Sequence, residues 1–80
     1  MKSATELKNI HKRILLLKGQ QELLNVEFAE LDAKPNKSKD ETKHLANVRN
    51  LQWSLIYEIQ GLQKKFKDVS AQVINEIINS

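Results

Sequence analysis

Two long stretches of the chain place an apolar residue at alternating steps of three and four positions, and this spacing constrains the fold more than any other feature. The first stretch runs from Leu7 to Leu31 and the second from Leu45 to Val73, and a single glutamine interrupts each. On an α-helix this spacing gathers the apolar side chains into one narrow stripe that packs against a partner helix. The sequence therefore predicts two amphipathic helices that pair along a heptad seam.

The only proline of the chain, Pro35, separates the two periodic stretches. Proline disfavours helical backbone in the residue before it and has no amide hydrogen of its own. We therefore expect a single domain over residues 1–80. Its first helix should span about residues 4–33, its loop 34–38 and its second helix about residues 39–78.

Two short segments have the spacing of a capping box, which marks the start of a helix. In this motif a serine and a glutamate three residues later each accept a hydrogen bond from the other's backbone amide. Ser3 and Glu6 have this spacing before the first periodic stretch, and Ser38 and Glu41 have it before the second. Both pairs are predicted to cap a helix.

A loop of about five residues leaves no room for a crossover, so the two helices should be antiparallel neighbours. Folding the chain about this loop pairs Leu17 with Ile59 and places the two seam glutamines, Gln21 and Gln52, in adjacent layers. Their amides could bond each other and fix the register, or they could reach water at the edge of the seam. The predicted fold class is an all-α, antiparallel two-helix hairpin resembling a coiled coil.

The composition excludes several other classes of protein. The 80 residues include two glycines, one proline and no cysteine. So few chain breakers argue against a β-sandwich or barrel, and the lack of cysteine excludes disulfides and thiol chemistry. The longest fully apolar run, Ile14–Leu17, is far shorter than a membrane-spanning helix, which needs roughly 20 apolar residues. It is also shorter than the apolar core of a signal peptide. We therefore expect a small cytoplasmic protein with no membrane partner.

No set of residues in the sequence has the spacing of a catalytic or metal-binding site. The two histidines, His11 and His44, would lie about 30 Å apart along the folded rod and could not share a metal ion. Motifs for a zinc protease, a phosphate-binding loop or a nucleophile elbow are absent. We therefore expect a protein that is not an enzyme and has no cofactor, no metal and no small-molecule substrate.

The heptad seam leaves many apolar side chains unused, near the middle of the rod and at the C-terminal end. A core made by two helices seldom outweighs chain entropy by a comfortable margin, and exposed apolar stripes commonly mark association surfaces. We therefore expect the hairpin to associate, either as a homodimer forming a four-helix bundle or with a different protein. The predicted partner-binding residues are Leu16, Gly19, Leu23, Val26, Trp53, Ile56, Tyr57, Ile74, Ile77 and Ile78.

Protein–protein binding is therefore the predicted function, as in a self-assembling subunit, an adaptor, a small chaperone or an inhibitor. Trp53 and Tyr57 are the expected anchors, because large aromatic side chains dominate the energetics of interfaces.

A basic cluster supports an alternative function. The net charge is +3, and the antiparallel register brings six cations to one level of the rod: Lys8, Lys12, Arg13, Lys64, Lys65 and Lys67. These could contact the phosphates of nucleic acid in a small hairpin dimer, or could simply keep the protein soluble. In general architecture the hairpin resembles the small plasmid RNA-binding dimers built from two helical hairpins, and also hairpin chaperones and phage or secretion accessory proteins.

Overall fold

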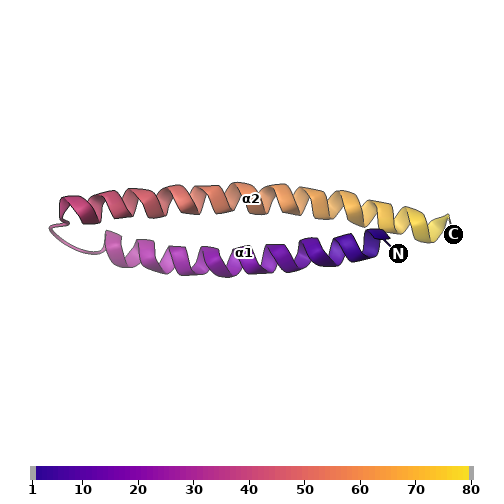
Figure 1. Ribbon diagram of the computed structural model, residues 1–80, viewed down its shortest axis with the longest axis horizontal. Helices are drawn as coiled ribbons and strands as arrows, with labels where there is room; N and C mark the ends of the chain where they lie inside the picture. The colour runs from indigo at the N-terminus through magenta and orange to yellow at the C-terminus, as the bar shows by residue number, and fades with distance from the viewer. Residues whose placement is uncertain (1, 80) are drawn as a thin grey trace.

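The computed structural model describes residues 2–79 and shows two long helices lying side by side (Figure 1). Helix α1 spans Lys2–Asp32 and helix α2 spans Lys39–Ile78. They run antiparallel and form a rod of 64 × 15 × 14 Å, with no strand among the described residues. The predicted all-α helical hairpin is confirmed, and the predicted helix boundaries are correct to within two residues.

The heptad seam forms the core of the hairpin. Every seam position from Leu7 to Leu31 and from Leu45 to Val73 is buried or half-buried. The buried hydrophobic side chains are Ile10, Ile14, Leu17, Val48, Ile59 and Val69. Leu17 and Val48 are the most deeply buried, at 1% exposed each. The alternating three- and four-residue spacing therefore identifies the residues that fill the core.

The two seam glutamines do not bond each other. Gln52 donates from Nε2 to Oδ1 of Asn25 over 2.8 Å, and both Gln21 and Gln52 are half-buried. Asn25 lies one helical turn beyond Gln21 and comes level with Gln52 in the antiparallel register. The seam amide on α2 is therefore satisfied by a residue on the flank of α1, and of the two alternatives that the sequence leaves open, the mutual Gln21–Gln52 bond does not form.

A residue with left-handed backbone conformation and a lysine side chain determine the shape of the loop. Asn36 has a φ of 59°, a conformation that asparagine tolerates better than most residues. The Nζ of Lys37 donates to the carbonyl oxygens of Asp32 and Lys34, each over 3.0 Å. A cation at this place satisfies carbonyl groups at the C-terminal end of α1, where the helix dipole favours positive charge.

The predicted capping box at the start of α2 is present. The Glu41 amide donates to Ser38 Oγ over 3.1 Å, and the Ser38 amide donates to Glu41 Oε1 over 3.2 Å. Lys34 also reaches across the loop to Glu41, with 2.8 Å between Nζ and Oε2. The hydrogen bond from Lys34, together with the bond from the Ser38 amide, lowers the pKa of the Glu41 carboxyl, and Glu41 raises the pKa of Lys34.

The predicted capping box at Ser3 and Glu6 is wrong. Helix α1 begins at Lys2, so Ser3 already lies inside the helix. Its hydroxyl donates to the carboxylate of Glu76 on α2, and Glu6 instead forms an ion pair with Lys65. Both side chains are therefore used for contacts between the helices.

Replacing Ser38 with alanine is expected to lower the free energy of unfolding by about 1 kcal/mol, because the N-terminus of α2 loses its side-chain acceptor. Urea denaturation followed by far-ultraviolet circular dichroism measures the change. Ser3→Ala is the matched control and should cost less, because Ser3 caps no helix. Equal losses for the two variants would contradict the prediction.

Candidate interaction surface

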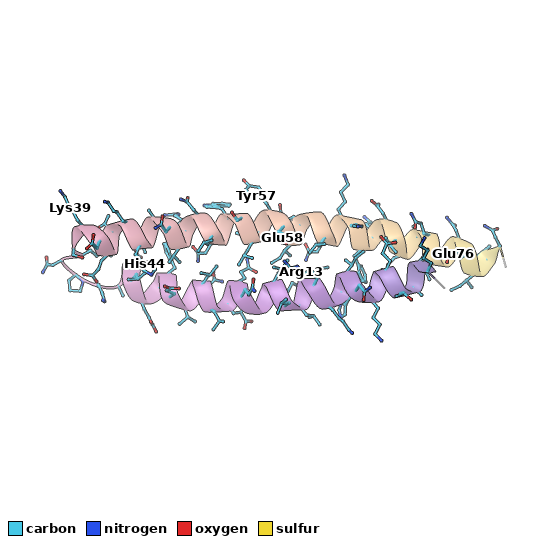
Figure 2. The ribbon with its side chains drawn as sticks, in the orientation of Figure 1. Arg13, Lys39, His44, Tyr57, Glu58 and Glu76 are labelled. Atoms are coloured by element: carbon cyan, nitrogen blue, oxygen red, sulfur yellow. The ribbon has the colours of Figure 1, made fainter. Side chains whose placement is uncertain are left out.

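Among the described residues, one edge of the seam carries two ion pairs and one hydrogen-bonded histidine–carboxylate pair between the helices. They join Glu6 to Lys65 over 3.7 Å, Arg13 to Glu58 over 3.2 Å and His44 to Glu27 over 2.7 Å. Figure 2 shows Arg13 and Glu58 meeting between the two helices. The side chains are 43–59% exposed, so each pair contributes modestly to stability and mainly favours this alignment of the helices. These six residues are called the charged edge below.

The charged edge is interrupted at Gln20, which stands where the seven-residue repeat of Glu6, Arg13 and Glu27 would place another charge. A groove of about 480 Å³ lies at this level, lined by Gln20, Leu23, Leu24, Leu51, Ser54, Leu55 and Glu58. Four of these residues are leucines. The interruption therefore leaves an apolar recess on an otherwise charged flank.

On the opposite flank of the seam, α2 carries Trp53. A smaller hollow of about 200 Å³ is lined there by Asn25, Phe28, Arg49, Gln52, Trp53 and Ile56. Trp53 and Tyr57 stack at 6.2 Å between ring centroids, and are 50% and 67% exposed. Tyr57 points away from α1 (Figure 2). The two rings therefore form an exposed aromatic pair on the outward side of α2.

The outward side of α1 carries a second stripe, opposite its seam, and its six positions are all exposed. We call it the outer stripe of α1, and it consists of Lys12, Leu16, Gly19, Leu23, Val26 and Glu30. Leu16, Leu23 and Val26 are 54%, 73% and 57% exposed. A Cβ added at Gly19 would meet nothing within 4 Å. The middle of α1 is therefore apolar on two opposite sides, of which the hairpin covers one.

The end of α2 extends past the start of α1 (Figure 1), as the greater length of the second predicted helix implies. The last apolar residues of this segment, Ile74, Ile77 and Ile78, are 56%, 60% and 72% exposed. They form a separate apolar area at the end of the rod.

The ten predicted partner-binding residues therefore occupy three areas and not one surface. Leu23 and Trp53 are level along the rod, yet they line different recesses on opposite flanks of the seam. Nine of the ten are exposed and Ile56 is half-buried. Leu15 and Leu51, at 57% and 54% exposed, are not among the predicted contacts. Leu51 could have been found from the heptad pattern, because it faces Gln20 where the charges of the edge are missing.

The six cations of the basic cluster are divided in a similar way. Arg13 and Lys65 are held in the ion pairs of the charged edge. The remaining four are exposed on outward positions of two different helices: Lys8, Lys12, Lys64 and Lys67. Part of the positive charge that the sequence places at this level is therefore balanced inside the hairpin.

The histidines serve packing and pairing. The ring of His11 lies 6.1 Å from the ring of Phe66, and His44 pairs with Glu27. Among residues 2–79 no three histidine or carboxylate side chains are grouped so that they could hold a metal ion. Over the same residues neither helix has an apolar stretch able to cross a bilayer.

Comparison with known protein families, curated proteins and solved structures gives no match to this chain.

Proposed function

We propose that this chain is a protein–protein interaction module that assembles with further copies of itself through the apolar helix faces its own hairpin leaves uncovered. One observation carries the proposal: within residues 2–79, ten large hydrophobic side chains are half or more exposed, against six that are buried. A two-helix chain of this size gains little stability from its own core, so a partner that covers these faces adds to it substantially.

The distribution of charge favours this function over binding to nucleic acid. Affinity for phosphates needs cations that face one groove or one strand. Here Arg13 and Lys65 pair with carboxylates on the charged edge. The guanidinium of Arg49 lies over the Phe28 ring at 5.6 Å and so packs within the hairpin. Nucleic-acid binding is the alternative that the following experiment tests.

Sedimentation and thermal melting of the purified chain over a wide range of concentration test the proposal. We expect reversible self-association and a melting temperature that rises with protein concentration, because a partner that binds only the folded state stabilises it. A chain that stays monomeric, melts cooperatively at one temperature and shields the indole of Trp53 from quenchers would contradict it. Gel shifts of RNA and DNA hairpins that appear at low salt and vanish as salt rises would support the alternative.

A further inference from the structure

The outer stripe of α1 is complementary to itself when a second copy is turned end for end. Reversal about the level of Gln21 sets Lys12 opposite Glu30 of the second copy, Leu16 opposite Val26, and Gly19 opposite Leu23. Any stripe of residues at alternating steps of three and four positions keeps its spacing when one helix is reversed, so the spacing itself is not evidence for a dimer. The residue types carry the information: opposite charges meet at both ends, aliphatic pairs follow, and a glycine faces a leucine near the middle.

We propose that a second copy of this chain packs on this stripe, α1 against α1 and antiparallel, across a two-fold axis level with Gln21. This inference rests on the proposed function and specifies its partner, face and orientation. The two Lys12–Glu30 pairs would close the ends of an apolar centre. A parallel arrangement in register would instead place Lys12 against Lys12 and Glu30 against Glu30, so the charges select the antiparallel one.

The charges of the stripe are available for this role. On the charged edge each lysine or arginine already has a carboxylate on the other helix. Among the described residues, neither Lys12 nor Glu30 takes part in an ion pair, and both are exposed. The charged edge thus uses its lysine and arginine within the hairpin, whereas this outward pair is left for a partner.

Gly19 supports the same face. Glycine weakens a helix interior relative to alanine, and packing inside the hairpin does not require it, since a Cβ there would meet nothing within 4 Å. In the proposed dimer the missing side chain lets Leu23 of the second copy approach the backbone of α1.

The outward side of α2 fits a second copy less well. Reversal about Tyr57 would set Trp53 opposite Gly61 and Tyr57 opposite itself, but it would flank them with Asn50 opposite Lys64. Opposite charges do not meet at either end of that arrangement. Charge complementarity therefore selects α1.

Disulfide trapping tests the arrangement, because the natural chain has no cysteine. The double variant Leu16→Cys/Val26→Cys should form a covalent dimer rapidly under mild oxidation. Each single variant should not, because its cysteine would lie about 15 Å from its counterpart along the antiparallel axis. That distance exceeds the roughly 7 Å between Cα atoms that a disulfide can span, and it also prevents closure within one helix. Asn50→Cys/Lys64→Cys on α2 is the matched control.

The outcomes separate this inference from the function on which it rests. A chain that sediments as a dimer while the Leu16/Val26 variant cross-links no faster than the α2 control would overturn the inference and leave the proposed function standing. Rapid cross-linking of Leu16→Cys alone would show a parallel arrangement and would also overturn it. A chain that stays monomeric at every concentration would contradict both the inference and the proposed function.

Charge reversal provides a second test without cysteine. Lys12→Glu is expected to weaken self-association about tenfold, because it turns two attractive contacts per dimer into repulsive ones. Glu30→Lys should do the same, and combining the two substitutions should restore the dimer. Lys64→Glu makes the same change of charge on α2 and should have little effect. Single reversals that change nothing, or a combined variant as weak as either one, would refute the inference.

Discussion

Replacing Leu17 with alanine is expected to lower the free energy of unfolding of the hairpin by about 3 kcal/mol. Leu17 is 1% exposed, in the middle of the seam, so the shorter side chain loses apolar contacts and leaves a cavity that two stiff helices cannot close. In a chain of this size such a loss is a large part of the total stability. Urea denaturation followed by circular dichroism measures it.

Leu16→Ala is the matched control, because the adjacent leucine has the same chemistry and is 54% exposed on the outer stripe of α1. In dilute solution its effect should stay below about 0.5 kcal/mol. At higher protein concentration it should weaken self-association, and so it should reduce only the extra stability that the dimer gives to the folded chain. Equal effects of the two substitutions in dilute solution would contradict the assignment of Leu17 to the core.

Replacing both glycines with alanine is expected to raise the free energy of unfolding by about 2 kcal/mol, about 1 from each position. Neither Gly19 nor Gly61 has a positive φ, and a Cβ at either would meet nothing within 4 Å, so alanine keeps the helix and removes conformational freedom from the unfolded chain. The melting temperature of the double variant in dilute solution should rise by several degrees.

The single glycine variants also report on association. Gly19→Ala should stabilise the monomer and weaken the dimer, because its new methyl group meets Leu23 of the second copy. Gly61→Ala should stabilise the monomer and leave the dimer unchanged. A decrease in thermal stability with either substitution in dilute solution would show that the position is more crowded than the hairpin indicates.

The sequence is sufficient to predict the hairpin because its determinants are local. Heptad spacing identifies the core residues, and Pro35 with the capping box of Ser38 identifies the turn. The Ser3 box fails because its residues find partners on α2, in Glu76 and Lys65, and spacing along one helix cannot show such competition. Spacing along α2 likewise does not identify Asn25 as the partner of Gln52, because Asn25 lies off the seam on the other helix.

The candidate surfaces were only partly predictable. Exposure of the apolar residues follows from the seam, because whatever lies off the seam of a two-helix rod faces outward. Which of them share a surface depends on the flank of the seam that each occupies. Leu23 and Trp53 come level along the rod, yet they line recesses on opposite flanks. The level of a charge along the rod does not show its partner, and so it does not reveal that Arg13 and Lys65 pair with carboxylates on the opposite helix.

The hairpin brings the start of α1 and the end of α2 to the same end of the rod (Figure 1). Because the proposed dimer reverses one copy, the chain ends of the two copies would emerge at opposite poles, with the α1–α1 contact between them. Domains fused to this chain would then be held apart by a stiff, bipolar spacer, and the uncovered aromatic pair of each α2 would line its sides.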